Sequence, residues 1–295
     1  MKPVAGSKMA LSVLMFSCVA GSEEDPLIRI DDPVGPRLLR RGDGWALIGS
    51  QRWMHRRFRN MIEKRHPGAY GFNMARIIRM DDVLLTSAAD GLDQLVVLGA
   101  GYDTRAYRMA EDLRTTRIFE VDLPHMSRDK QKRLRRAVGV IPKNVAFVEV
   151  DFNSEQLFER LRASGYERSR RTLFIFSGVS MYLPEEAVMG LFADIGAQGA
   201  GSSIVFDYLF ADALTNPSHY PGAAEFIART EVAGEKLRFG MAKDAIGDAL
   251  AARGLVLDEQ HDMGEIADHY LRRSDGTRAA TPYGFAAVAR ASAVG

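Results

Sequence analysis

Strand-like and helix-like segments alternate along the middle of the chain, and this alternation limits the folds that the sequence can adopt. The strand-like segments are residues 94–99, 117–122, 145–151, 172–177 and 202–210. Helix-like segments separate them, at about 104–113, 125–138, 154–163 and 185–197. The alternation predicts a doubly wound α/β sheet with parallel strands. Two strand-like segments contain the runs LVVL and LFIF, which are apolar on both faces, as expected where helices cover both sides of a sheet.

The flanking segments predict additions to this core. Residues 9–90 are mostly helical in pattern, while 211–240 are less regular and contain two prolines. A helix over 242–254 and two more strand-like segments, 255–261 and 284–291, follow. We therefore predict a helical N-terminal extension (1–90) and one integrated core (91–295) with an inserted lid at about 211–240. The aromatic residues expected to form that lid over a substrate are Tyr208, Phe210, Tyr220 and Phe226, unless the segment only covers the core.

Charge and cysteine content exclude some classes of protein. The formal net charge is +1, whereas dedicated nucleic-acid binders usually carry a strong basic excess. The basic stretches 51–59 and 128–136 are interpreted as solvated helix faces. The single cysteine, Cys18, excludes an intrachain disulfide and a cysteine-based metal cluster. It suits a reducing compartment, so we expect a cytoplasmic protein without a metal site.

The apolar run at residues 9–21 has two interpretations. It follows Lys2 and Lys8 and has the length of a signal-peptide core. The alternative is a first helix that packs on the domain, which the enzyme-like pattern downstream favours. No apolar run reaches the ~18–20 residues of a membrane span, so we expect no membrane association.

A glycine turn, Gly99-Ala100-Gly101, follows the first strand of the core. Gly99 allows a tight turn, and Gly101 lets the backbone approach a ligand at the carboxyl end of the strand. The dinucleotide-binding fingerprint requires Gly or Ala three residues later, where this chain has Thr104. The turn therefore predicts a nucleotide-type ligand but argues against a dinucleotide.

Acidic residues end the next two strands. Glu120 and Asp122 lie about twenty residues past the glycines, where an acid accepts hydrogen bonds from ribose hydroxyls. We favour Asp122, which is nearer the carboxyl end, over a merely solvated acid. Asp151 and Phe152 end the third strand and suit an adenine site, although Asp151 is equally suited to capping a helix.

Four strings give the chain a specific resemblance. VVLGAGYDTRAYR (96–108), FEVDLPHMSRDKQKRL (119–134), VEVDF (148–152) and FSGVSMYLPEEAV (176–188) resemble the S-adenosylmethionine-dependent methyltransferases of the leucine carboxyl methyltransferase family. That family includes bacterial polyketide O-methyltransferases. The similarity extends to residues 68–85 and 234–255 and covers about 23–291.

The resemblance implies a class I methyltransferase, Rossmann-like, whose seven-stranded sheet ends in an antiparallel edge pair. It also implies S-adenosylmethionine as methyl donor and an oxygen as acceptor. By position, Arg76 would bind the methionine carboxylate through its bidentate fork. Gly99 and Gly101 would line the methionine part, Asp122 would hold the ribose, and Asp151 with Phe152 the adenine. The implied cofactor-binding set also includes Ala100, Asp103, Leu123, Ser177 and Gly178. Asp103 and Arg105 are expected to fix the turn or to pair with each other.

Two positions depart from the family pattern. Ser177 replaces a glutamate that in relatives contacts the cofactor's amino group, so backbone carbonyls would have to take over that contact. An arginine frequent in the early helix of relatives is also missing, and Cys18 lies near its place.

The acceptor is left open by the sequence. A carboxylate acceptor needs no base, whereas a hydroxyl does. The candidates for such a role are Tyr182 and His219, with His261, His269 and Asp207 as further possibilities. We favour an O-methyltransferase of small molecules in natural-product biosynthesis, with no nucleic-acid partner. The alternatives are a methyltransferase of protein or peptide C-terminal carboxylates and a non-catalytic cofactor-binding homologue. RNA methylation is a further alternative, because the same family includes tRNA-modifying relatives. It is less favoured, because those relatives carry extra domains.

Overall fold

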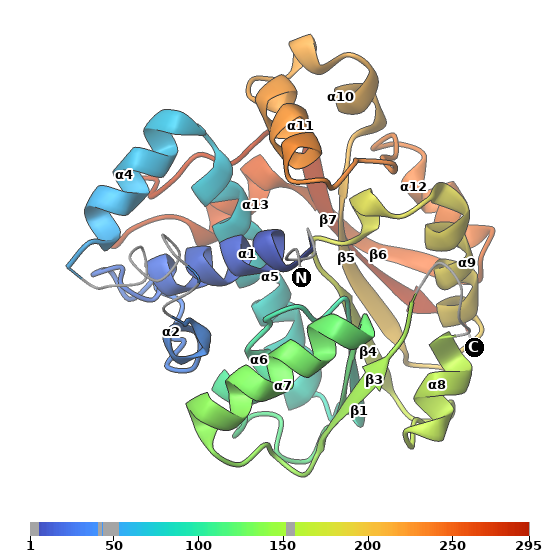
Figure 1. Cartoon of the computed structure of the whole chain (residues 1–295). Coiled ribbons are helices and arrows are strands. Elements are labelled where there is room, and N and C mark those ends of the chain that lie inside the picture. The colour runs from blue at the N-terminus through green and yellow to red at the C-terminus, as the bar shows by residue number, and fades with distance from the viewer. Residues whose placement is uncertain (1–5, 41–42, 44–52, 152–156, 295) are drawn as a thin grey trace.

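One seven-stranded sheet organises the chain in the computed structural model, which describes residues 6–40, 43, 53–151 and 157–294. The strand order is β3-β2-β1-β4-β5-β7-β6 (Figure 1). The strands are β1 (Gln94–Leu98), β2 (Arg117–Asp122), β3 (Val145–Glu149), β4 (Thr172–Phe176), β5 (Ser203–Leu209), β6 (Leu255–Asp262) and β7 (Ala286–Ala293). Strands β1 to β5 pair in parallel, and β7 pairs antiparallel with both β5 and β6. The predicted α/β sheet and its antiparallel edge pair are confirmed.

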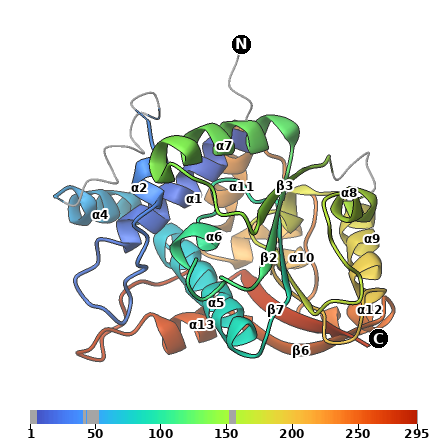
Figure 2. The same cartoon turned by 90° about the horizontal axis from the view of Figure 1, so that it is seen from below.

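Helices cover both faces of this sheet (Figure 2). On one face lie α5 (Ala69–Ala89), α6 (Arg105–Arg108) and α7 (Pro124–Val138). On the other lie α8 (Leu157–Ala163), α9 (Glu185–Gly196) and α12 (Ile246–Ala251). None of the helices in the described ranges is both long and apolar enough to cross a membrane.

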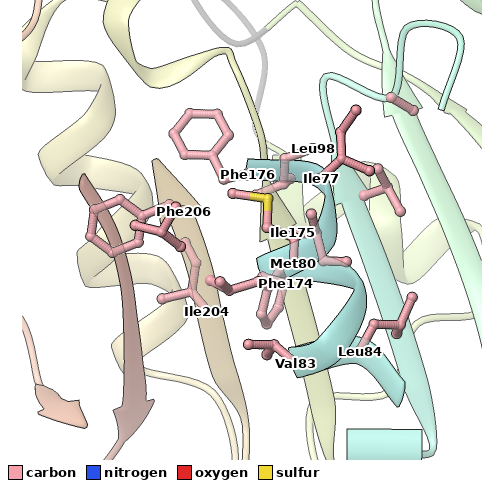
Figure 3. Packing of buried hydrophobic residues seen from close by; sticks show 14 of the residues in the cluster. Ile77, Met80, Val83, Leu84, Leu98, Phe174, Ile175, Phe176, Ile204 and Phe206 are labelled. Atoms are coloured by element: carbon pink, nitrogen blue, oxygen red, sulfur yellow. The ribbon is translucent and has the colours of Figure 1, made fainter. Parts of the chain in front are cut away.

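The core is densest where α5 crosses the middle of the sheet (Figure 3). Ile77, Met80, Val83 and Leu84 of α5 share one buried core with Ile175 of β4, whereas the ring of Phe174 packs against α8 on the other face of the sheet. All six are at most 6% exposed. Burial of this apolar surface fixes α5 on the sheet and thereby fixes Arg76, which precedes Ile77.

Two helices differ from the sequence expectation. α12 begins only at Ile246, because Met241 instead bridges Phe210, with its N–H donating to the Leu209 carbonyl (2.9 Å), and residues 243–245 form a turn. α13 (Met263–Tyr270) was not predicted. Its start carries a capping box between Asp262 and Glu265, a sequence signal that was available.

The N-terminal extension is joined to the glycine turn through Asp32. The extension contains α1 (Gly6–Ala20), α2 (Gly35–Leu38) and α4 (His55–Arg65), and α1 packs on α5. The buried Asp32 carboxylate accepts hydrogen bonds from Thr104 Oγ1 (2.7 Å), Ser17 Oγ (3.2 Å) and the Gly35 amide (2.7 Å). Thr104, which departs from the dinucleotide fingerprint, therefore ties the extension to the turn. Residues 9–21 include the end of α1 and lie against the domain, as their second interpretation predicts.

The segment at 211–240 is more regular than predicted. It contains α10 (Ala211–Thr215), the short 3-10 helix η3 (Pro217–His219) and α11 (Ala223–Val232). α11 follows Gly222, whose φ of +81° favours glycine. Of the two prolines that suggested irregularity, Pro217 begins η3 and Pro221 lies in the connection between η3 and α11.

The substitution Thr104→Val tests the link between extension and turn. Removing the hydroxyl leaves the buried Asp32 carboxylate without its shortest side-chain donor, so we expect the free energy of unfolding to fall by about 1–3 kcal/mol. Urea unfolding followed by circular dichroism measures this. Thr215→Val, at an exposed hydroxyl on α10, is the matched control and should change stability by less than about 0.5 kcal/mol. Equal effects of the two substitutions would contradict the role given to Asp32.

Candidate active site

A cavity of about 820 Å³ opens at the carboxyl ends of β1, β2, β3 and β4. The residues that follow these strands line one part of it, and α1, α5 and the segment around α11 line the rest. Ligands of open α/β sheets bind at this edge. The predicted cofactor residues that line the cavity are Arg76, Gly99, Ala100, Gly101, Asp103, Asp122, Leu123, Asp151, Ser177 and Gly178. Phe152, also predicted there, lies outside the described residues.

The glycine turn lies against the chain that follows β4. Gly99 has a φ of +66°, and a Cβ built on it would lie 2.5 Å from Val179 Cγ2. Gly101 has a φ of +43°, and its built Cβ would lie 3.4 Å from the Cβ of Ala10 in α1. Because of its conformation and its close neighbour, position 99 accepts only glycine without strain.

Asp122, the last residue of β2, lines the cavity, whereas Glu120, two residues earlier in the strand, does not. The Asp122 carboxylate accepts from the amides of Gly101 (2.5 Å) and Leu123 (2.7 Å) at the cavity wall. Burial raises its pKa above the usual aspartate range, although these amides oppose the shift. Glu120 is 2% exposed, lies 2.9 Å from Lys130 Nζ and does not line the cavity. The placement agrees with the preference for Asp122 as the ligand-facing acid.

A second buried group, the Arg76–Asp207 ion pair, shapes the cavity beside β4. Arg76 Nη1 lies 3.2 Å from Asp207 Oδ2, and Arg76 Nη2 donates to Asn73 Oδ1 at 2.8 Å. The other carboxylate oxygen of Asp207 accepts from the Gly178 amide at 2.6 Å. Asp207, considered above as a base after the fifth strand, instead lies within β5, fully buried and outside the cavity lining. Its position makes it a support for Arg76 and for the turn at Gly178.

The DTR string forms an ion-pair network at the start of α6. Arg105 pairs with Asp103 and, through Nε, with Asp81 at 2.7 Å, while Arg108 contacts the same Asp81 at 2.6 Å. The predicted pairing of Asp103 with Arg105 is confirmed. The charge of Arg105 keeps the pKa of Asp103 below its usual range despite burial. The network holds α5 and α6 together behind the glycine turn.

Tyr182 reaches the cavity, but the predicted histidines do not. His219 is exposed on η3, His261 faces Glu259 on β6, and His269 is exposed on α13. Burial and the nearby charge of Glu235 raise the pKa of the Tyr182 phenol above its usual value. Tyr182 is therefore a hydrogen-bond donor at neutral pH and a poor proton acceptor.

The prediction of an aromatic lid is wrong for three of its four residues. Among its four aromatic residues, only Phe226 lines the cavity. Tyr208 is fully buried in β5, and Phe210 and Tyr220 pack against each other with ring centroids 6.3 Å apart. Alternation along β5 and its continuation places Tyr208 and Phe210 in the core rather than over a ligand, and Tyr220 packs against that core from outside.

Sequence reasoning missed the wall supplied by α1 and by the chain after α11. Met9, Val13 and Phe16 of α1 line the cavity, as do Glu235 and Arg238. The only signal for the second group was the family-like string at 234–255, which the sequence analysis quoted without assigning a role. Cys18, near the place of the missing arginine, is buried outside the cavity lining.

Gly178→Ala tests the packing of the Arg76 guanidinium. A Cβ there would lie 2.5 Å from Arg76 Nη1, on a backbone with φ of +67°. We expect a stability loss that exceeds that of Gly91→Ala by about 1–3 kcal/mol. Gly91 has a φ of +85° with nothing within 4 Å of a built Cβ. Gly91→Ala therefore measures the loss of stability that comes from the backbone conformation alone. Urea unfolding of both variants checks this, and equal losses would show that Arg76 does not need the open space.

The sequence and the fold of this chain are similar to those of known proteins. The sequence model described as "Leucine carboxyl methyltransferase" matches residues 12–196. YktD of Bacillus subtilis (strain 168) is 29% identical over 199 residues, which are 67% of this chain and 65% of that protein. A protein of Streptomyces coelicolor is 41% identical over 124 residues, 42% of this chain and 43% of that protein. Both relatives are provisionally named S-adenosyl-L-methionine-dependent methyltransferases. The matched part of the chain thus spans less than two thirds of the length of either.

Two solved structures share the fold over almost the whole chain. A DUF574 family protein from Streptomyces avermitilis superposes with a TM-score of 0.59 at 13% identity, covering 96% of this chain and 97% of that one. A protein from Thermobifida fusca YX, provisionally named a methyltransferase, has a TM-score of 0.59 at 15% identity, with 93% and 96% covered. At such low identity these likenesses show the fold alone. The family match over well more than half of the sequence shows more: the chain belongs to the leucine carboxyl methyltransferase family.

Proposed function

We propose that this protein is an S-adenosylmethionine-dependent O-methyltransferase of small molecules, in natural-product biosynthesis of the polyketide type. The observation that carries the proposal is the composition of the 820 Å³ cavity. One part is lined by the residues that follow four parallel strands, and the other by apolar side chains together with charged ones. Ile62, Phe72, Phe226 and Val232 belong to this second part. A cofactor and an acceptor can therefore share one enclosed space.

The residues at the strand ends fit the chemical groups of S-adenosylmethionine. Arg76 is 3% exposed and has one buried N–H, on Nε, without a partner in the described structure. A buried donor of this kind is expected where a ligand carboxylate binds. Asp122 and Asp151 offer carboxylates to the ribose and the adenine amine, and the glycine turn offers a close backbone. Gly178, beside Ser177, adds backbone to the region where relatives carry a glutamate.

Methyl transfer requires the protein mainly to align the methyl donor with the acceptor and to exclude water. When bound, the cofactor supplies a methyl group already activated by a positive sulfur. Arg76 and Asp122 would orient it, while α1 and the chain after α11 cover the cavity and limit access of water. A small acceptor is favoured over a protein C-terminus because the acceptor wall includes apolar side chains such as Phe72 and Phe226 and lies beneath these segments. A peptide panel assayed beside small acceptors distinguishes the two.

Calorimetric titration with S-adenosylmethionine and with its demethylated product tests the cofactor. We expect micromolar binding of both, because the proposed contacts do not depend on the transferred methyl group. Asp122→Asn should weaken both about tenfold, since it removes the charge offered to the ribose, equivalent to about 1.4 kcal/mol. Asp112→Asn, at an exposed acid, is the control and should bind as the natural protein does. A folded protein that binds neither compound would overturn the proposal.

A further inference from the structure

Glu235 is a cavity carboxylate with no partner among the residues that the structure describes. It follows α11 and is partly buried in the cavity lining. Its side chain makes no hydrogen bond or ion pair with any residue in the described ranges, although Arg229 and Lys236 line the same cavity. Buried carboxylates are normally paired, so an unpaired one at a ligand cavity calls for a functional reason.

The backbone around Glu235 is fixed at both ends. The Glu235 amide donates to the Thr230 carbonyl of α11 at 2.8 Å, and the Arg238 amide donates to the Met181 carbonyl at 2.8 Å. Met181 lies in the loop that follows β4, next to Tyr182. The carboxylate is therefore carried on a short strap between α11 and the edge of the sheet where the cofactor is proposed to bind. Such anchoring limits how far the group can move away from the cavity.

Tyr182 relates Glu235 to the cofactor end of the cavity. The charges of both Glu235 and Arg76 act on the Tyr182 phenol, and all three residues line the cavity. Arg76 is the residue proposed to hold the amino-acid part of the cofactor, to which the reactive sulfur belongs. Glu235 therefore faces the same cavity as the proposed cofactor site, from the segment after α11 that supplies the proposed acceptor wall.

We propose that Glu235 is the general base for methyl transfer and that the acceptor is a phenolic or enolic hydroxyl on an apolar ring system. The inference rests on the proposed function. The acceptor O–H bond breaks and its proton passes to a carboxylate oxygen of Glu235. The electron pair on the acceptor oxygen forms the O–CH₃ bond, while the pair of the sulfur–methyl bond remains on sulfur. The proton then leaves Glu235 for solvent.

Two physical arguments favour a hydroxyl over a carboxylate. A carboxylate acceptor needs no base, and beside Glu235 it would be repelled by a second negative charge in a partly buried space. The raised basicity of Glu235 suits proton abstraction: burial raises its pKa from the ordinary glutamate value to about 7. A phenol, with a pKa of about 10, lies within reach of such a base, whereas an aliphatic alcohol is far less acidic.

The rate should depend on pH through Glu235. Only its ionised form accepts the proton, so kcat/KM is expected to rise about tenfold between pH 6 and pH 8 and then level off. The other charged or titratable groups of this region are Arg76 on α5, Arg229 on α11 and Tyr182, with His66, Lys236 and Arg238 also in the lining. Asp207 on β5 acts on Tyr182 from outside the lining. Burial and the charge of Arg229 lower the pKa of His66, away from the midpoint expected for Glu235, and burial raises the pKa of Tyr182 further above it.

Glu235→Gln separates the base from the rest of the site. The assay follows transfer of labelled methyl from S-adenosylmethionine to fused-ring phenols such as 1-naphthol, with the matching acids such as 1-naphthoate beside them. We expect phenols to be methylated, and E235Q to lose about 100-fold or more in kcat together with the rise with pH. Cofactor affinity should be unchanged. Glu231→Gln, at an exposed acid on α11 outside the cavity lining, is the matched control and should retain the full rate.

A titration without substrate provides an independent readout. Carbon-13 NMR of glutamate-labelled protein, with the Glu235 signal assigned by its loss in E235Q, should give a midpoint near pH 7. A midpoint near the ordinary value of about 4.3 overturns the proposal. So does methylation of acids in preference to phenols, an unchanged rate in E235Q, or a protein that binds S-adenosylmethionine and methylates no phenol. Failure to bind S-adenosylmethionine instead counts against the proposed function.

Discussion

The buried ion pair between Arg76 and Asp207 is the interaction on which the site depends. It joins α5, β5 and the turn after β4, because Asp207 contacts Arg76 through one oxygen and the Gly178 amide through the other. Removing either charge would leave the other uncompensated in a dry interior, at a cost of about 3–5 kcal/mol. The pair also reduces the net charge that Arg76 offers to a ligand. What remains for binding is a guanidinium held in one orientation, with one N–H still unpartnered.

At the glycine turn, too, one residue supports the backbone from behind while another residue faces the cavity. Lys130 pairs with Glu120 and donates to the Ala100 carbonyl at 3.3 Å, so a buried charge stabilises the backbone of the turn from the side away from the cavity. Asp122 meanwhile holds the Gly101 amide from the cavity side. The turn is thus held from two directions. A ligand that replaces the Asp122 contact would still meet a turn fixed by Lys130.

The local pattern predicted the parts of this molecule that local chemistry determines. Apolar runs such as LVVL and LFIF marked buried strands, and the glycines and acids after them marked the edge where the cavity lies. Long-range placement was beyond such a pattern. Nothing local to Asp207 shows that it meets a guanidinium 131 residues away, and nothing local to Glu235 shows that it lines the cavity. The histidines and aromatic rings of the expected lid were misplaced for the same reason. Residue type suggested roles for them, but strand alternation and core packing decided where they lie.

The strap that carries Glu235 has a consequence for how this site can diversify. It belongs to a segment inserted between β5 and α12, and its described contacts to the sheet edge run through backbone atoms such as the Met181 carbonyl. Backbone contacts survive most changes of side chain. In the proposed site, new side chains on α11 and the strap would therefore change the acceptor while the strand-end residues proposed to bind the cofactor stay in place. Donor binding and acceptor choice would then be able to change independently of each other within one cavity.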